Sequence, residues 1–517
     1  MPLSRNTFGL LERSARSSSR DAIALAYCGE ERSFAALHER SLRFAAGAAG
    51  AGVAPGDRVA VLLGNGHEWP EVFFGLAALG AVCVPVNVLL EPAEVAHVLA
   101  DSDSRCLVVD PRIGGLLSEL EAIPDLVITV GAVDRGSATR ILAYEDLMAA
   151  APARLCGPTL DELAILYYSS GTTGLPKAAS HTHNGVLWNS FHQIPDLALG
   201  PEDVYLVVPS LSWAAGFHDV TLALLGLGGR SVMMPTGGAT PERITATIEG
   251  SGATHALLVP TLLRQFLEAP QLLERLRLST LRMVISGAEP VPRPTIEAIA
   301  AELPGCQVLQ GYGLSEFPTV ATILRPEEAL DHAGSAGRPG SITELAVARD
   351  DGEIAAAGEG EVLLRSYATM REYFRRPQET AAAFADGWLH TGDLGAVDEE
   401  GFLTITGRKK DMIISGGLNV YPKEVEDVIY RVEGVVEASV VGVADPRWGE
   451  ATVAIVVGAG VDPAAVEREC AQRLASYKRP RKVIVRTEPL PRNPIGKVLK
   501  RELRPWAEAR VGSAVGR

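Results

Sequence analysis

Cysteine is scarce in this sequence of 517 residues. The six cysteines are scattered, and no two of them form a C-x-x-C pair. This spacing argues against a disulfide framework and a cysteine-rich zinc site, and it predicts reduced thiols in a cytoplasmic protein. The cysteines are Cys28, Cys83, Cys106, Cys156, Cys306 and Cys470.

Long hydrophobic runs are also lacking. The longest nearly unbroken run, residues 72–86, contains two glycines and a proline, and it predicts a buried helix, a turn and a strand rather than a transmembrane segment. No secretory signal is visible. The Arg- and Ser-rich start loosely matches an organellar transit peptide, but Glu12 breaks the acid-poor pattern, and Phe8, Leu10 and Leu11 favour a first helix.

Positive charge is in deficit. The formal net charge is −15, which disfavours nucleic acid as a partner. The charge is uneven, because residues 408–517 hold 20 Lys and Arg against 14 Asp and Glu. A basic C-terminal part beside an acidic remainder suits a domain that closes over phosphate-bearing ligands. Simple electrostatic docking of the two parts would explain the uneven charge as well.

The length predicts two or more domains. From residue 57 to about 313, apolar strand-like segments alternate with helical patterns, which predicts an α/β fold with mainly parallel sheets covered on both faces. Ligands bind such sheets at the carboxyl ends of strands. The expected strands are residues 58–63, 106–109, 163–168, 204–208, 232–235, 256–259, 283–286 and 307–310.

Two further regions follow. Short strand-like runs from about 331 to 408 predict a small antiparallel β subdomain, which would complete an N-terminal domain of residues 1–408. Residues 409–517 predict a smaller α+β C-terminal domain with helices near 422–432 and 463–474.

The most informative segment is Tyr168-Ser-Ser-Gly-Thr-Thr-Gly-Leu-Pro-Lys177. It follows an apolar strand-like run, and residues 184–192 after it predict a helix. Small side chains, hydroxyls and a lysine between strand and helix favour a phosphate-binding loop. It is not a Walker A loop, which ends in Gly-Lys-Ser/Thr. The alternative is an ordinary flexible turn.

This segment resembles the signature loop of the adenylate-forming (AMP-binding) enzymes, a family that includes acyl-CoA synthetases, peptide-synthetase adenylation domains and luciferases. The resemblance implies that the loop binds the phosphates of ATP, with hydroxyl donors from Thr172 and Thr173. The implied ATP-binding residues here are Ser169, Ser170, Gly171, Thr172, Thr173, Gly174 and Lys177.

Two later motifs match the family in the expected order. Residues 286–290 include Gly287, Ala288 and Glu289, and the family places adenine near this stretch. The segment Gln310-Gly311-Tyr312-Gly313-Leu314-Ser315-Glu316 resembles the family's Y-G-x-T-E. By resemblance, Tyr312 lies against adenine, Ser315 bonds the α-phosphate and Glu316 helps to hold Mg²⁺. The alternative for Glu316 is a carboxylate at a helix start.

The remaining motifs lie near the domain boundary and the C-terminus. The segment 388–393 resembles the family's W-x-x-T-G-D, so Asp393 would bind the ribose hydroxyls unless it is only a turn aspartate. By resemblance, Arg408 contacts ribose or phosphate and Lys410 is the hinge. The loop Ser415-Gly416-Gly417 would lie beside the pantetheine arm of coenzyme A, and Lys497 is the lysine of the family's P-x-x-x-x-G-K motif.

The resemblance implies an AMP-forming acyl-CoA ligase. A carboxylic acid attacks the α-phosphorus of ATP and pyrophosphate departs; a thiolate then attacks the acyl adenylate and AMP departs. The C-terminal domain is implied to rotate between the steps, with Lys497 serving the first and the loop at 415–417 the second. ATP, Mg²⁺ and coenzyme A are the implied cofactors, and the catalytic residues are Lys497, Glu316, Thr172 and Lys410.

The acid is less specified. Ala214 stands where peptide synthetases have an amine-binding Asp, and Gly313 stands where acetyl-CoA synthetases have Trp, so a hydrophobic monocarboxylic acid, fatty or aryl, is favoured. The expected acyl-pocket residues, each of which could equally be plain core, are Trp213, Phe217, His218, Gly313, Leu314 and Pro318. The alternatives are an acyl-AMP ligase that serves a carrier protein and an inactive nucleotide-binding regulator. A homodimer is left open.

Overall fold

The computed structural model describes residues 4–110, 119–120, 122–131, 140–153, 157–169, 176–287, 291–492 and 498–511. Its contacts divide the chain into two compact units. The first comprises Met1–Leu345, Leu364–His390 and Glu400–Leu403, and the second comprises the rest. Within the described ranges, no helix has the length and apolar character needed to cross a lipid bilayer.

The first unit contains a nine-stranded sheet of order β16-β15-β14-β13-β12-β10-β11-β1-β2. The strands from β14 to β1 are parallel, and β15, β16 and β2 are antiparallel additions at the edges. The bounds are β1 (Ile23–Tyr27), β2 (Glu30–Ser33), β10 (Val204–Val207), β11 (Arg230–Met233), β12 (His255–Leu257), β13 (Met283–Gly287), β14 (Gln307–Leu314), β15 (Phe317–Leu324) and β16 (Arg338–Pro339).

A second sheet of the same unit has eight strands in the order β20-β9-β8-β4-β3-β5-β6-β7. Its strands from β8 to β7 are parallel, whereas β9 and β20 are antiparallel. The bounds are β3 (Arg58–Leu62), β4 (Val82–Pro85), β5 (Cys106–Val109), β6 (Leu126–Thr129), β7 (Arg140–Ala143), β8 (Leu163–Ser169), β9 (Lys177–Thr182) and β20 (Glu372–Tyr373).

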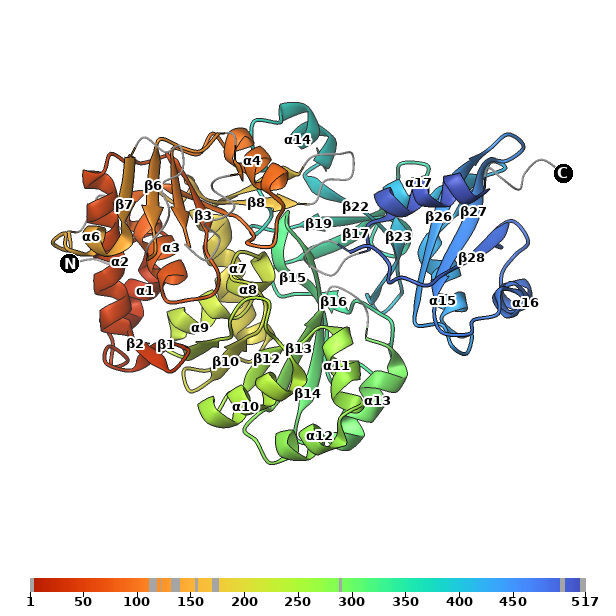
Figure 1. Cartoon of the computed structure of the whole chain (residues 1–517), viewed down its shortest axis with the longest axis horizontal. Coiled ribbons are helices and arrows are strands. Elements are labelled where there is room, and N and C mark those ends of the chain that lie inside the picture. Colours follow the sequence, from red (N-terminus) through yellow and green to blue (C-terminus); the bar gives the residue numbers. More distant parts are fainter. Residues whose placement is uncertain are drawn as a thin grey trace. The chain divides into compact units, whose positions relative to one another are not determined.

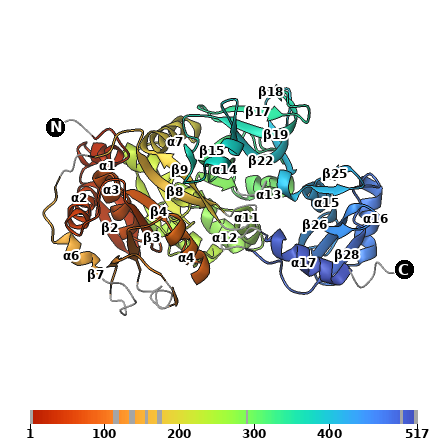
Figure 2. The same cartoon turned by 90° about the horizontal axis from the view of Figure 1, so that it is seen from above.

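Helices cover both sheets. Successive side chains of a strand point to opposite faces, so Leu206 packs with α10–α13 on one side, while Tyr205 and Val207 face the other. Figure 1 shows α10–α13 grouped along β10–β14, and Figure 2 shows α1, α2 and α3 together. The bounds are α1 (Phe8–Ala15), α2 (Phe34–Gly50), α3 (Glu68–Leu79), α4 (Pro92–Asp101), α6 (Tyr144–Met148), α7 (His183–Asp196), α8 (Ala214–Phe217), α9 (Thr221–Leu227), α10 (Pro241–Ser251), α11 (Pro260–Leu267), α12 (Pro270–Arg277), α13 (Arg293–Glu302) and α14 (Pro377–Ala383).

The space between the two sheets is filled by one apolar core, which we call the central layer. It joins side chains of α1, α2, α3, α7 and α9 to strand residues of both sheets, among them Val59 from β3 and Val207 from β10. The outer face of the eight-stranded sheet packs on α4. The first unit is therefore a layered α/β structure, as the alternating sequence pattern predicts.

Divisions between the two units fall within strands β17, β19, β22 and β23, and the second unit is α+β. Strands β17, β19 and β22 belong to a sheet of order β18-β17-β19-β22-β21, with β23 paired to β22; a further sheet has the order β25-β24-β27-β26, with β28 paired to β27. The bounds are β17 (Glu344–Ala348), β18 (Ile354–Ala355), β19 (Gly358–Arg365), β21 (Phe384–Ala385), β22 (Trp388–Val397), β23 (Leu403–Arg408), η2 (Lys409–Asp411), β24 (Ile413–Ser415), β25 (Leu418–Val420), α15 (Pro422–Ile429), β26 (Glu437–Asp445), β27 (Gly449–Val457), α16 (Pro463–Arg473), β28 (Lys482–Arg486) and α17 (Lys500–Val511).

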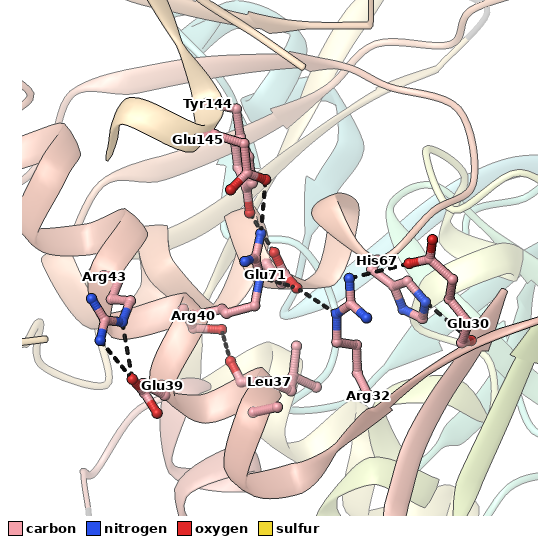
Figure 3. Close-up of polar contacts among 12 residues, drawn as sticks. Glu30, Arg32, Leu37, Glu39, Arg40, Arg43, His67, Glu71, Tyr144 and Glu145 are labelled. Carbon is pink, nitrogen blue, oxygen red and sulfur yellow. Dashed lines mark hydrogen bonds and ion pairs between the residues drawn. The ribbon is translucent and has the colours of Figure 1, made fainter. Parts of the chain in front are cut away.

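A buried carboxylate ties the N-terminal helices together. Glu71 of α3 is fully buried; it accepts a 2.8 Å bond from Arg40 of α2 and a 2.5 Å bond from the hydroxyl of Tyr144 of α6. Arg32 of β2 lies 3.7 Å from the same carboxylate (Figure 3). Because a buried charge is tolerated only when it is paired, these contacts fix the packing of three helices.

The structure confirms most of the predicted elements and corrects two. The helix expected at 184–192 is α7, but strand β9 precedes it, so the segment 168–177 connects two antiparallel strands rather than a strand and a helix. The strand expected at 307–310 continues to Leu314. In both places the prediction missed antiparallel pairing between residues close in sequence.

Candidate functional site

Two predicted motifs lie side by side at the carboxyl ends of β13 and β14. In their parallel register, Ser286 pairs with Gln310 and Gly287 pairs with Gly311. A Cβ atom at Gly311 would lie 1.9 Å from Cγ1 of Val320, so close packing alone requires glycine there. Because ligands of parallel sheets bind at such strand ends, this pair of motifs marks the floor of the candidate site.

The Gln310 side chain reinforces this floor. It is buried, and its Oε1 accepts a 2.8 Å bond from the backbone N–H of Val291, just beyond the first motif. Tyr312 packs against the apolar cluster around Phe317. Two predicted adenine-site residues, Ala288 and Glu289, lie outside the described residues.

Ser315 and Glu316 form the turn of the β14–β15 hairpin. The alternative of a helix-start carboxylate for Glu316 is therefore wrong. Two contacts fix the turn: the His181 ring bonds the Ser315 carbonyl through Nε2 at 2.8 Å, and the Met370 N–H donates to the Glu316 carbonyl at 2.7 Å. Burial lowers the pKa of His181 to about 4, so its ring is neutral and Nε2 carries the donated proton.

Tyr373 of β20 joins Glu316 to Lys177. Its hydroxyl donates a 2.6 Å bond to Glu316 Oε1, and the ammonium of Lys177 lies 3.5 Å from the centre of its ring. Burial lowers the pKa of Lys177, and the nearby carboxylates of Glu316 and Glu379 oppose that effect. Sequence analysis missed Tyr373, because it stands 57 residues after Glu316 and no motif spacing links them.

The structure describes only the two ends of the predicted phosphate-binding loop. Ser169 ends β8 and pairs with Lys177 at the start of β9. The predicted residues Ser170, Gly171, Thr172, Thr173 and Gly174 lie outside the described residues, as does Lys497. The described part of this segment thus places Lys177, but not the loop itself, beside Glu316.

In the second unit, Asp393 and Arg408 form an ion pair. Asp393 is buried in strand β22, and Nε of Arg408 lies 3.0 Å from its Oδ1. Asp393 is therefore a strand residue rather than a turn aspartate. The neighbouring Gly392 N–H donates to Glu361 at 3.1 Å, and Lys409 lies 3.0 Å from the same carboxylate.

The predicted coenzyme A loop is a tight hairpin turn. Ser415 pairs with Leu418 across it, and Gly416 and Gly417 both have positive φ, at 61° and 81°. Two-residue turns of this kind favour glycine at both positions. A Cβ at Gly416 would lie 2.8 Å from the ring of Trp448, whereas Gly417 faces open space. Lys410 lies just before, in the short helix η2.

Comparison with known proteins decides the family. Residues 11–374 match the family described as AMP-binding enzyme, and residues 424–497 match the AMP-binding enzyme C-terminal domain. The chain belongs to the AMP-binding enzyme family. A long-chain-fatty-acid–CoA ligase, FadD13 of Mycobacterium tuberculosis (strain ATCC 25618 / H37Rv), is 38% identical over 89% of this chain and 90% of its own length.

Two other relatives of this AMP-binding enzyme are informative. A feruloyl-CoA synthase of Amycolatopsis sp is 35% identical over 93% of this chain and 95% of its own length. The o-succinylbenzoate coenzyme A synthetase MenE from Bacillus subtilis, solved in complex with ATP and magnesium ion, shares 29% identity at a TM-score of 0.82, over 96% of this chain and 99% of the other.

The described residues of this AMP-binding enzyme fit a nucleotide-bound magnesium ion rather than a metal cage. Among them, no three His, Cys, Asp or Glu side chains gather as a metal site. Magnesium on nucleotides keeps its waters and takes one or two carboxylates. Glu316, held by Tyr373, would supply such a carboxylate.

The predicted acyl-pocket residues divide into two groups. Phe217 and His218, at the end of α8, are buried in the central layer, and the Phe217 ring lies 4.4 Å from that of Trp69. Trp213 caps the start of α8 and keeps some accessible surface. On β14 and β15, Gly313 is exposed, Leu314 is half-buried and Pro318 is buried, its carbonyl bonded by Asn189.

Proposed function

We propose that this chain is an ATP-dependent acid–thiol ligase that converts a hydrophobic monocarboxylic acid to its acyl-CoA thioester. The observation that carries the proposal is the convergence of Lys177 and Tyr373 on Glu316, which lies in the turn directly after β14. A cation and a fixed carboxylate at this edge of the sheet suit a magnesium-bound triphosphate.

In the first half-reaction, a carboxylate oxygen of the acid bonds the α-phosphorus and the bond to pyrophosphate breaks. Lys177 would bind phosphate oxygens, and the Tyr373 hydroxyl would keep the Glu316 side chain oriented. When magnesium is bound at Glu316, its charge offsets repulsion among the phosphates. Lys497 and the hydroxyls of Thr172 and Thr173 are proposed to stabilise the same transition state.

In the second half-reaction, a thiolate bonds the acyl carbon and the bond to AMP breaks, leaving the thioester. We assign the hairpin Ser415-Gly416-Gly417 to the pantetheine arm, since its backbone turn leaves room beside Gly417. Lys410 is proposed as the hinge between the two half-reactions. Asp393 and Arg408 are proposed to bind ribose, which requires their ion pair to share its hydrogen bonds with the ligand.

The acid is proposed to be fatty or aryl. The exposed Gly313 places no side chain at the end of β14 that would shorten a pocket for the acid. The relatives named as a long-chain-fatty-acid–CoA ligase and a feruloyl-CoA synthase support both classes. A carrier protein is the second proposed acceptor.

We also propose a cytoplasmic location, where ATP and coenzyme A are supplied. The five cysteines among the described residues are all free thiols, which supports this location. A homodimer is a separate proposal, which sedimentation of the purified chain would test.

The decisive experiment measures AMP and pyrophosphate release from ATP–Mg²⁺ over acids from acetate to palmitate and from benzoate to cinnamate, with and without coenzyme A. We expect coenzyme A-dependent AMP formation for one hydrophobic class. Glu316→Gln should lower the rate about a hundredfold, by analogy with loss of one transition-state contact. The exposed Glu353→Gln is the matched control. Pyrophosphate exchange without coenzyme A-dependent turnover would indicate a carrier protein, and no AMP from any acid would contradict the ligase.

A further inference from the structure

Helix α4 carries two polar side chains, His97 and Asp101, that the proposed mechanism does not use. They stand four residues apart, so they lie one above the other on the same face of the helix. The helix packs on the outer face of the eight-stranded sheet through Val95, Val98 and Leu99, close to β8 (Figure 1). Both polar side chains reach beyond this apolar contact to segments that carry the candidate site.

His97 bonds the backbone directly before Lys177. Its Nε2 lies 2.8 Å from the carbonyl oxygen of Pro176. A carbonyl oxygen only accepts, so Nε2 carries the proton and the ring donates. Because Pro176 and Lys177 share one peptide group, this bond holds the backbone from which the Lys177 ammonium reaches the Tyr373 ring.

Asp101 holds the strand that precedes the same segment. Its Oδ2 accepts a 3.0 Å bond from the Tyr168 hydroxyl, and its Oδ1 lies 2.5 Å from Nη2 of Arg376. Burial and the Asp101 carboxylate raise the pKa of Tyr168, so its phenol stays protonated and donates. The rings of His97 and Tyr168 meet edge to face with centres 6.4 Å apart. We call His97, Asp101 and Tyr168 the α4 cluster.

The α4 cluster also supports Tyr373. The Arg376 N–H donates a 3.0 Å bond to the Tyr373 carbonyl, and the ion pair with Asp101 holds this turn against α4. Strand β20, which contains Tyr373, pairs with β9, which begins at Lys177. One helix thus supports the backbone of both side chains, Lys177 and Tyr373, that converge on Glu316.

The two aspartates near the end of α4 differ in burial and in partners. The Asp101 side chain is 13% exposed, and a carboxylate so far from water is tolerated only when it is paired. The Asp103 side chain is 50% exposed, and its carboxylate pairs with Arg58 and Arg375. Asp103 therefore offers a matched comparison, an aspartate that also bonds arginine but lies in solvent.

We propose that the three residues of the α4 cluster are positioning residues for adenylate formation, which hold Lys177 and Tyr373 in place for the phosphates of ATP. This inference rests on the proposed ligase function, in which Lys177 binds phosphate oxygens and Tyr373 orients Glu316. Groups that are held in place before ATP binds need less ordering in the transition state, and a displacement of about 1 Å can lower a rate about a hundredfold.

The test measures pyrophosphate exchange by the full-length chain with ATP–Mg²⁺ and the most active acid. His97→Phe keeps the ring beside Tyr168 but loses the donor to Pro176, and Tyr168→Phe removes only the hydroxyl that bonds Asp101. We expect each change to lower kcat/KM for ATP about tenfold. His97→Gln retains an N–H donor and should restore most of the rate. Asp103→Asn is the matched control and should behave as wild type.

The second half-reaction separates positioning from a general structural defect. Thioester formation from a synthetic acyl adenylate and coenzyme A involves no triphosphate, so His97→Phe and Tyr168→Phe should each change its rate by less than about twofold. An equal loss in both half-reactions would overturn the proposal. If His97→Phe folds poorly, Tyr168→Phe still gives the comparison, because it removes a single oxygen atom.

A double-mutant cycle tests whether His97 acts through Lys177. If it does, His97→Phe should have little further effect on exchange once Lys177→Met has removed the ammonium, because neighbouring groups that act together are not additive. Additive losses would show that His97 does not act through Lys177 and would overturn its assignment as a positioning residue.

The two proposals can be told apart. Exchange by His97→Phe and Tyr168→Phe that equals that of Asp103→Asn overturns the positioning role and leaves the ligase standing. No AMP from any acid contradicts the ligase. Calorimetric titration with ATP–Mg²⁺ then decides the positioning role alone: variants that bind ATP as tightly as the wild-type chain overturn it, and a wild-type chain that binds no ATP overturns both proposals.

Discussion

The hydroxyl of Tyr373, in β20 of the eight-stranded sheet, donates a 2.6 Å hydrogen bond to Oε1 of Glu316, in the turn between β14 and β15 of the nine-stranded sheet. The bond holds one carboxylate oxygen in place, and the Tyr373 ring also contacts the Lys177 ammonium. A single side chain thus positions the proposed magnesium ligand and a proposed phosphate-binding cation.

Removing the Tyr373 hydroxyl should leave the Glu316 carboxylate in the site but less firmly oriented. We expect Tyr373→Phe to lower the rate of adenylate formation about tenfold and to raise the magnesium concentration needed for half-maximal rate, because a hydrogen bond to an ionised group is lost. Pyrophosphate exchange at varied magnesium measures both. Tyr367→Phe is the matched control, and an unchanged magnesium dependence in Tyr373→Phe would contradict the positioning role.

The Asp393–Arg408 pair should control nucleotide affinity. Arg408→Gln removes the guanidinium that pairs with the buried Asp393 carboxylate, and Asp393→Asn removes the charged acceptor. We expect either change to weaken AMP binding about tenfold or more, measured by calorimetry. Glu353→Gln removes one partner of the exposed Arg349–Glu353 pair and should leave the affinity for AMP unchanged. Wild-type affinity in both site variants would show that the pair is only structural.

The hairpin at Gly416 should serve only the thiol step. Gly416→Ala adds a Cβ at φ 61° and 2.8 Å from Trp448, which strains the turn by at least about 1 kcal/mol. We expect pyrophosphate exchange to persist while coenzyme A-dependent turnover falls. Gly417→Asn is the control, because its Cβ meets open space and asparagine tolerates positive φ. An equal loss in both half-reactions would rule out a separate role.

The Glu71 network should contribute mainly to stability (Figure 3). Burial raises the pKa of Glu71, whereas its bonds from Tyr144 and Arg40 lower it. Glu71→Ala would remove the buried partner of Arg40, which keeps only the exposed Glu145, and would remove the acceptor of the Tyr144 hydroxyl, so we expect a loss of about 3–5 kcal/mol in the free energy of unfolding. The exposed Glu145→Ala should cost less than about 1 kcal/mol. Denaturant titration of both variants measures the difference.

Buried histidines should make the protein sensitive to acid. Burial lowers the pKa of His67, His181 and His183 to about 4 each, against an ordinary value near 6.5. The unfolded state therefore binds protons first, and stability is lost as pH falls from about 6.5 toward 4, by about 2 kcal/mol per histidine at pH 5.

Thermal melts between pH 7.5 and 5 test this expectation. His67→Gln should flatten the pH dependence, because one buried proton-binding site is removed. The partly exposed His332→Gln should not. A melting temperature that stays constant over this range would contradict the prediction.

The sequence by itself determined the local elements and the motifs. Apolar runs and helical periodicity act over a few residues, so β13, the first part of β14 and α3 could be placed from them. The family could also be inferred, since its motifs are contiguous segments.

Only the tertiary structure decided which side chains meet. The pairing of β9 with β8, the hairpin that carries Glu316, and the contact of Tyr373 with that carboxylate depend on hydrogen bonds between segments whose spacing follows no pattern. Alternation along a strand predicts that a side chain faces a core, but packing alone determines what it faces there.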